Sequence, residues 1–312
     1  MKRIDVYSYG VVSSSTLYSL NYGFPQPQGY SEIKEVYSIL GGEAANSSLV
    51  LSRLGVKVKL DGSWLSRNTD GKNVQGILRG NGVDVSRLKL VPRGVEEVVF
   101  SDRKTRTIFG TYGRMLSRRQ WNKAKKEDVL RARVVNLDPF FNDDSFSVSK
   151  IAATRKIPVV TVDCKHDHPI LKNTGVVIVA ASFLQENYAN EDKTTLLGKY
   201  TDASRALIIF TFGENGVVYG RQGGPVNHLK SHVIDTVDTV GGGDAFRAGI
   251  VFGLLKEWDD EKKIRFANAL AAVTCTKYPG VVNSPGYREV QKFMKGHPMP
   301  PPVPHRALLS VK

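Results

Sequence analysis

Short runs of β-branched and aliphatic residues alternate with helical patterns along most of the chain, and this alternation restricts the fold more than any other feature. Strands that alternate with helices favour right-handed βαβ crossovers, which build a mostly parallel sheet covered by helices on both faces. The expected strands are 4–8, 56–60, 134–137, 159–163, 176–180, 207–211 and 217–219. The expected helices are 44–54, 144–155, 183–200, 245–257, 261–277 and 286–295. The sequence therefore predicts an α/β fold with a mostly parallel central sheet.

Two stretches interrupt this alternation. Residues 13–39 are rich in Ser, Tyr, Gly and Pro, and residues 95–109 alternate polar and apolar side chains like an exposed hairpin. We expect about 12–40 and 95–110 to form a small sheet that stands off the main domain as a lid over a cleft. The apolar residues expected on one face of this lid are Phe24, Tyr37, Ile39, Val99 and Ile108.

The end of the chain differs in composition from the rest. Residues 297–312 contain five prolines, which is typical of an extended tail without a core of its own. The sequence thus predicts one domain over 1–296, followed by a Pro-rich tail.

Composition excludes several classes of protein. The chain is 41% hydrophobic and 24% charged, as in globular domains. It has no apolar run of ~20 residues that could span a membrane, and its start lacks an apolar segment of the signal-peptide type. Cys164 and Cys275 are too few for a disulfide framework or a cysteine-rich zinc site. We expect a cytoplasmic protein with no membrane partner.

The formal net charge of +14 raises the question of a nucleic-acid partner. The densest basic cluster lies within residues 118–126, around Trp121, in a helix-like segment that also carries Glu127 and Asp128. A solvated helix face explains this cluster better than a nucleic-acid site does, so we expect no nucleic-acid partner.

The chemistry is concentrated in residues 238–246, Asp-Thr-Val-Gly-Gly-Gly-Asp-Ala-Phe. A strand-like run ends near Ile234, three glycines follow, and an apolar helix opens after them. Glycines at such a junction let an anion approach backbone N–H groups, and the helix dipole favours negative charge there. Asp244 would lie in the first helical turn, where a carboxylate can take the proton of a hydroxyl that attacks a phosphoryl group. The alternative is a tight turn in which Asp244 is an ordinary residue at the start of a helix. The glycines alone do not decide between an anion site and such a turn.

The same residues resemble the second signature of the ribokinase-like (PfkB-type) carbohydrate kinases, which has Ala at the position of Gly242. Residues 41–46, Gly-Gly-Glu-Ala-Ala-Asn, are similar to the first signature. The resemblance extends from about residue 4 to residue 293. It implies a three-layer α/β sandwich with a small β lid, and ATP-dependent, Mg²⁺-assisted phosphorylation of a small sugar, sugar acid or cyclic polyol.

The resemblance also implies roles for individual residues. Asp244 would be the base, with the amides of Gly241, Gly242 and Gly243 around the transferred phosphoryl group. The implied ATP contacts are Thr211, Gly213, Gly216, Asn268 and Ser182. The implied acceptor contacts are Gly41, Gly42 and Asn46. Asp238 and Ser284 match positions near a monovalent-cation site, which would hold K⁺.

Several positions depart from the family pattern. Glu43 replaces the lysine of ribokinases proper, so the acceptor is expected to differ from ribose. No carboxylate follows the first strand, where Ser13 and Ser15 are the candidate hydroxyl contacts instead. Ser182 stands where the family has the Asn of an Asn-x-x-Glu motif. Either Gln185 or Glu186 would take the role of the acidic Glu of that motif.

Cations on the lid and on the helix after the glycines are further candidates. Arg103, Lys104 and Arg106 could reach an acidic or phosphorylated acceptor, although exposed strand charges often only protect a sheet edge. Arg247 could face the transferred phosphate, or it could lie on the helix surface.

Other functions stay open from the sequence. They are a nucleoside kinase of the same fold, a catalytically silent relative that binds sugar or nucleotide, and a nucleic-acid-binding protein. Exposed strand edges seek partners, so a homodimer through the lid is also expected.

Overall fold

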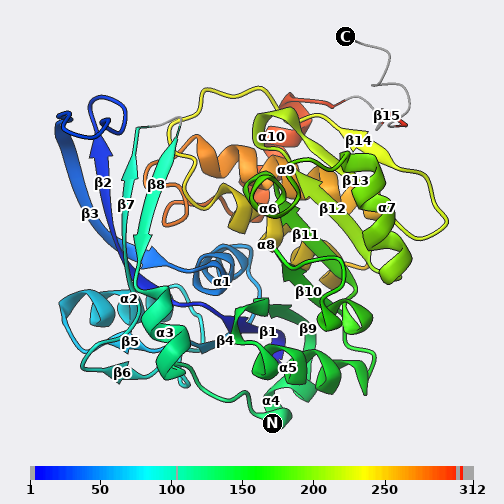
Figure 1. The fold of residues 1–312 in the computed structure, drawn as a ribbon, viewed down its shortest axis with the longest axis horizontal. Helices are drawn as coiled ribbons and strands as arrows, with labels where there is room; N and C mark the ends of the chain where they lie inside the picture. The colour runs from blue at the N-terminus through cyan, green and yellow to red at the C-terminus, as the bar shows by residue number, and fades with distance from the viewer. Residues whose placement is uncertain (1–3, 103–104, 300–302, 305–312) are drawn as a thin grey trace.

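A large sheet forms the centre of the molecule (Figure 1). The computed structural model describes residues 4–102, 105–299 and 303–304. Within these residues the sheet has nine strands in the order β15-β14-β13-β12-β11-β10-β9-β1-β4. Their bounds are β1 (Ile4–Gly10), β4 (Val58–Gly62), β9 (Ala132–Leu137), β10 (Val159–Val162), β11 (Val176–Ala180), β12 (Leu207–Thr211), β13 (Val217–Gly220), β14 (Asn227–Leu229) and β15 (Val303–Pro304). From β4 to β12 all neighbouring strands are parallel, and β13, β14 and β15 continue the sheet antiparallel.

Helices cover both faces of this sheet (Figure 1). One group comprises α1 (Glu43–Arg53), α2 (Thr69–Gly80), α8 (Gly242–Leu255), α9 (Asp260–Cys275) and α10 (Tyr287–Gly296). The other comprises α3 (Tyr112–Arg118), α4 (Lys126–Arg131), α5 (Asp143–Ala153), α6 (Ala181–Tyr188) and α7 (Lys193–Ala203). Short elements complete the domain: β5 (Leu65–Ser66), β6 (Leu90–Val91) and the 3-10 helices Pro139–Phe141, Pro169–Asn173 and Gly213–Asn215.

The apolar strands are explained by burial on both faces. In β11, Val176 and Ile178 belong to the core on the α8 side, whereas Val177 and Val179 belong to the core on the α5 side. Successive side chains of a strand point to opposite faces, so a strand covered on both sides must be apolar throughout. The predicted three-layer α/β architecture is confirmed.

A second sheet of four strands in the described residues stands beside the central one (Figure 1). It consists of β2 (Ser13–Leu20), β3 (Ile33–Gly41), β7 (Glu96–Ser101) and β8 (Arg106–Gly110), in the order β3-β2-β7-β8. The small separate sheet expected from the two interrupting stretches is therefore present, and we call it the lid sheet. Residues 103 and 104, with the candidates Arg103 and Lys104, lie outside the described residues, as do 300–302 and 305–312 of the Pro-rich tail.

The lid sheet has two different faces. Leu17, Ile39 and Val99 are buried on its inner face, where Val240 and Tyr278 of the main domain pack against them. Phe24 instead packs on Phe100 and Phe109, at ring-centroid distances of 5.5 and 6.3 Å. Because Phe100 follows Val99 along β7, its ring points to the outer face. The expectation that Phe24 shares one apolar face with Ile39 and Val99 is wrong.

Three further expectations need correction. The predicted helix 183–200 is two helices, α6 and α7, because the Asp192 side chain caps α7 by accepting a hydrogen bond from the Thr195 N–H at 2.8 Å. Residues 230–237, which include the strand-like run, have no strand pairing. The basic cluster is mostly a connection between α3 and α4, where Trp121 is buried and stacked on Phe141 at 4.8 Å.

Among the described residues, none of the helices combines the length and apolar character that crossing a bilayer requires.

Candidate active site

Asp244 lies where helix α8 begins. Gly241 is the residue before the helix, with a left-handed φ of 78°, and no side chain caps the helix. The first N–H groups of a helix have no partner within the helix. At Gly241 a Cβ would overlap the Val281 side chain, whereas at Gly243 a Cβ would meet no atom within 4 Å. The Gly242 N–H donates to the Thr239 carbonyl at 3.3 Å, and open space lies beside the next N–H groups of the helix, which fits an oxyanion or phosphoryl group.

The Asp244 side chain is half-buried, and its carboxylate points toward the first signature. Its Oδ2 accepts a hydrogen bond from Asn46 Nδ2 at 2.8 Å, although the two residues are far apart in sequence. Burial is the main reason that the pKa of Asp244 rises to about 7, and the bond from Asn46 and the charges of Arg247 and Arg106 oppose this rise. A carboxylate whose pKa lies near neutrality is suited to take a proton.

Asp138 and Arg247 form a buried ion pair near Asp244. Arg247 Nη1 lies 2.5 Å from Asp138 Oδ1, and both side chains are almost completely buried, with 1% and 0% exposed. Asp138 Oδ2 accepts a hydrogen bond from the Val11 N–H at 2.7 Å. Arg247 is therefore not on the helix surface. Within the described residues, its Nε and Nη2 atoms are buried without a hydrogen-bond partner.

Asp138 was missed by the sequence analysis, although a signal for it existed. It directly follows β9 in a parallel sheet, and ligands of such folds bind at the carboxyl ends of the strands. At Gly10, which ends β1, a Cβ would overlap the Asp138 carboxylate, so only glycine leaves room for it.

The first-signature residues adopt conformations that bring backbone close to the cleft. Gly42 has a φ of 86°, and a Cβ there would overlap the Val11 carbonyl. Glu43 begins α1, and burial, together with the charges of Asp138 and Asp244, holds its pKa well above the usual value. The carboxyl groups of Glu43, Asp138 and Asp244 therefore share one acidic region.

The predicted nucleotide turn follows β12. Gly213 and Gly216 have φ values of 58° and 90°, and the Phe212 N–H donates to the Gly216 carbonyl at 2.8 Å. Thr211, which ends β12, is partly exposed. Ser231 Oγ donates to the Gly213 carbonyl at 2.6 Å and fixes the turn against the segment after β14.

Asn268 on α9 connects to that same segment. Its Nδ2 donates to the Lys230 carbonyl at 3.3 Å, and its Oδ1 accepts from the His232 N–H at 3.4 Å. Asn268 therefore positions the 230–232 segment next to the turn. Ser182, Gln185 and Glu186 all lie exposed on the first turns of α6, and their exposure does not choose between Gln185 and Glu186.

Asp238 and Ser284 are both buried near the loop that follows α9. Asp238 accepts hydrogen bonds from the N–H groups of Val240 and Gly280, at 2.9 and 3.0 Å. The Ser284 hydroxyl has no partner.

The lid contacts the glycine segment directly. Arg106 Nη1, from β8, donates to the Thr239 carbonyl at 2.9 Å, and Tyr37 packs edge-on against Tyr278 at 5.1 Å. The lid sheet thus reaches across to the segment that leads into the anion site.

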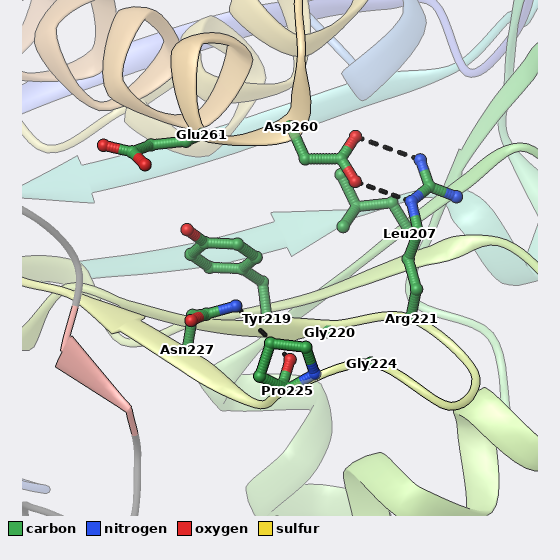
Figure 2. Close-up of a pocket in the computed structure, with 9 residues that line it drawn as sticks. All are labelled: Leu207, Tyr219, Gly220, Arg221, Gly224, Pro225, Asn227, Asp260 and Glu261. Atoms are coloured by element: carbon green, nitrogen blue, oxygen red, sulfur yellow. Dashed lines mark hydrogen bonds and ion pairs between the residues drawn. The ribbon is translucent and has the colours of Figure 1, made fainter.

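A surface pocket lies near the start of β12, whereas the predicted nucleotide turn follows the end of that strand (Figure 2). Its wall includes Leu207, the first residue of β12, and the ion pair between Arg221 and Asp260, at 2.6 Å. None of the candidate residues named above lines this pocket.

The chain is similar to known carbohydrate kinases. A model of the pfkB family carbohydrate kinases matches residues 179–285. A 5-dehydro-2-deoxygluconokinase from Clostridium botulinum is 27% identical over 85% of this chain and 86% of its own length. A ribokinase from Bacillus subtilis is 25% identical over 82% of this chain and 88% of its own length.

Among solved structures, Arabidopsis thaliana ribokinase complexed with ribose and ATP superposes with a TM-score of 0.79 at 18% identity, covering 94% of this chain and 99% of that one. The fold is the ribokinase fold. The matched family model and the kinases among the relatives support an ATP-dependent phosphotransferase. Within that class, the chain is similar to the ribokinase-like, PfkB-type carbohydrate kinases, whose family model matches residues 179–285.

Proposed function

We propose that this chain transfers the γ-phosphoryl group of ATP to a hydroxyl of a small sugar, sugar acid or cyclic polyol, with Asp244 as the base. The observation that carries this proposal is the position of a half-buried carboxylate, held by Asn46, at the start of α8, where no side chain of the described residues caps the helix. The match of residues 179–285 to the pfkB family of carbohydrate kinases supports ATP as the phosphoryl donor.

In the proposed reaction the acceptor hydroxyl gives its proton to Asp244 Oδ1 or Oδ2. The acceptor oxygen forms a bond to the γ-phosphorus, and the bond from that phosphorus to the bridging oxygen of ADP breaks. The N–H groups of Gly242 and Gly243 at the start of α8 stabilise the negative charge on the phosphoryl oxygens. Arg247, through its unpartnered Nε and Nη2, adds a buried positive charge nearby.

ATP brings Mg²⁺, which neutralises charge on the β- and γ-phosphates. In this chain Thr211, Gly213 and Gly216 would lie against the phosphates, and Asn268 holds the 230–232 segment beside them. Ser182, with Gln185 or Glu186, would contribute to water-mediated metal contacts from α6.

A monovalent cation such as K⁺ would occupy the region of Asp238 and Ser284. Support comes from the buried carboxylate of Asp238 and the buried, unpartnered hydroxyl of Ser284. Replacing K⁺ with Na⁺ in the assay should lower kcat. A kcat that does not depend on the monovalent cation would contradict the proposed cation site.

The acceptor contacts would come from Gly41, Gly42, Asn46, Ser13 and Ser15, with Arg106 closing the site from the lid. The test is ATP consumption measured against a panel of sugars, sugar acids, inositols and nucleosides. We expect consumption that depends on the acceptor. ADP binding without consumption for any acceptor would instead indicate a catalytically silent relative.

A further inference from the structure

A second surface pocket lies beside the end of α3 and the β5–β6 pair, in the part of the molecule below the lid sheet in Figure 1. It has a volume of about 340 Å³, which is in the range of sites for small organic ligands. It is lined by Trp64, Val91, Pro92, Arg93, Arg118 and Gln120. None of the residues proposed to contact ATP, the acceptor or the monovalent cation belongs to this lining. The proposed phosphoryl transfer therefore does not account for this pocket.

Positive charge is concentrated around the pocket. Arg93 and Arg118 line it, and Lys89 Nζ lies 5.0 Å from the ring centroid of Trp64 in its wall. None of these three cations makes an ion pair with a described residue, and no acidic side chain belongs to the described lining. Cations gathered around one hollow attract an anion into it. Guanidinium groups in particular suit phosphate, because they donate to its oxygens in pairs.

The neighbouring arginine in the basic cluster has a different environment. Arg119 Nη2 lies 2.8 Å from Asp144 Oδ2, and the Arg119 guanidinium lies over the ring of Trp121 at 5.7 Å. Arg119 therefore has partners within the chain, whereas Arg118 has no carboxylate partner among the described residues and lines the pocket. The cluster that the sequence shows as one basic segment thus contains a structural cation and a cation that is available to a ligand.

Hydrogen bonds fix the walls of the pocket relative to one another. The Trp64 N–H donates to the Gln120 carbonyl at 2.9 Å, and the Val95 N–H donates to the Trp64 carbonyl at 2.8 Å. Gln120 Nε2 donates to the Arg93 carbonyl at 2.8 Å. The backbone segments that carry Arg93 and Arg118 are therefore both tied to Trp64. A site formed before the ligand arrives loses less conformational freedom on binding.

The lining is not only cationic. Trp64, Val91 and Pro92 supply apolar surface next to the two arginines. Apolar walls with a few polar groups are typical of sites for small organic ligands, whereas an inorganic anion gains nothing from apolar contacts. The combination favours an organic compound that carries a phosphate group.

We propose that this pocket binds a small phosphate monoester. Arg93 and Arg118 bind the phosphate, Lys89 adds positive charge, and the organic part of the ligand lies against Trp64. Nucleoside monophosphates and sugar phosphates share this chemistry, and the experiment distinguishes them. The site is separate from Asp244, so its occupation does not depend on the proposed function.

The test is calorimetric titration of the full chain at low ionic strength with AMP, glucose 6-phosphate and inorganic phosphate. At least one ester should bind with a Kd below about 1 mM. In the double variant Arg93→Gln/Arg118→Gln that Kd should rise at least about tenfold, because the charge-assisted hydrogen bonds to the phosphate are lost. Both arginines are exposed, so the thermal unfolding temperature should not change. Tighter binding of AMP would identify the ligand as a nucleotide, and tighter binding of glucose 6-phosphate as a sugar phosphate.

Two controls locate the binding. Arg155→Gln removes an equally exposed arginine that makes no ion pair with a described residue and does not line the pocket, so the Kd should change by less than about twofold. Gly243→Val, which obstructs the proposed phosphoryl site, should leave the Kd unchanged. If Gly243→Val abolished binding and the double variant did not, the ester would bind at the start of α8 and the proposal would be wrong. Absence of binding by both esters, or inorganic phosphate that binds as tightly as either ester, would also overturn it.

Discussion

The groups around Asp244 shift its pKa in opposite directions. Burial raises its pKa, and Asn46, Arg247 and Arg106 lower it. Asp244→Asn keeps the size of the side chain but removes the proton acceptor. We expect turnover to fall by about 10²–10⁴-fold, the usual contribution of general-base catalysis. ATP binding, measured by calorimetry, should remain. Near-normal turnover of the best acceptor by this variant would show that Asp244 is not the general base.

The fold of Asp244→Asn can be checked independently of its activity. Because burial disfavours the ionised carboxylate, the native state loses stability as the pH rises from the usual pKa of an aspartate through about 7. The neutral asparagine has no such loss. Above pH ~7 its thermal unfolding temperature should therefore not be lower than that of the unchanged protein.

The pH dependence of the reaction follows from the same pKa. Asp244 must be ionised to accept a proton, and its pKa is about 7 in the free protein. We expect kcat/KM for the acceptor to decrease about tenfold for each pH unit below that value and to level off above it. Steady-state rates across this pH range, with ATP saturating, provide the measurement. A flat profile on the acidic side would mean that another group takes the proton.

The glycines before Asp244 are not equivalent. From the family pattern alone, alanine should fit at Gly242, but a Cβ there would lie 2.9 Å from Cys275 Sγ. Gly242→Ala should therefore lower thermal stability modestly, and combining it with Cys275→Ser or Cys275→Ala should restore it. At Gly243, apart from the helix's own backbone, no atom of the described residues lies within 4 Å of a Cβ, which leaves room for the phosphoryl group. Gly243→Val should keep stability but abolish most turnover. Equal effects of both variants on turnover would contradict the anion-site assignment.

At the scale of elements, the lid sheet and the start of α8 are connected through the Arg106–Thr239 contact and the Tyr37–Tyr278 contact. Binding of the acceptor between them should stabilise β2 and β7 together. We expect the acceptor to slow amide hydrogen exchange within 13–20 and 96–101. An ATP analogue alone should protect mainly 211–216 and 241–247. Such closure would exclude water from the phosphoryl group.

Arg106→Ala gives the control for this experiment. It removes the contact from the lid to Thr239 and should reduce the protection of the lid by the acceptor, while the protection by the ATP analogue stays. Protection confined to residues 118–126 on adding either ligand would mean that the site and its lid have been misplaced.

At the scale of the whole molecule, the outer face of the lid sheet is unusually apolar. Val36 and Phe109 are 56% and 55% exposed, and Phe24, at 41%, packs beside Phe109. Large exposed apolar groups on a sheet indicate a protein interface. We therefore propose a homodimer through this face, with a mass in light scattering of twice the 34.4 kDa of one chain.

Phe109→Ser should shift this dimer toward the monomer. The matched control is Val233→Ser, because Val233 is 96% exposed but lies outside the lid sheet. A mass that stays the same in both variants, or a wild-type protein that is monomeric at assay concentrations, would contradict the proposed interface.

Much of the fold could be predicted from the sequence, since its signals are local. Buried parallel strands such as Val176–Ala180 must be apolar on both faces, and helices must repeat their apolar residues with the helical period. The junction at Gly241 and Asp244 was also recognisable, because a left-handed glycine before a helix and an acid in its first turn are neighbours in sequence. The boundary between α6 and α7 was missed, since a continuous helical pattern outweighed the capping signal of Asp192.

Only the tertiary structure decided which distant side chains meet. No local pattern predicts that Arg247 is buried against Asp138, that Gly242 gives space to Cys275, or that Glu97 reaches Gly41 across two strands of the lid. A buried polar group is determined by its partners, and these come from strand order and register rather than from sequence spacing. The sequence by itself therefore predicted the type of chemistry that we propose for Asp244, and the packing of the lid on the central domain decided which polar side chains lie together near it.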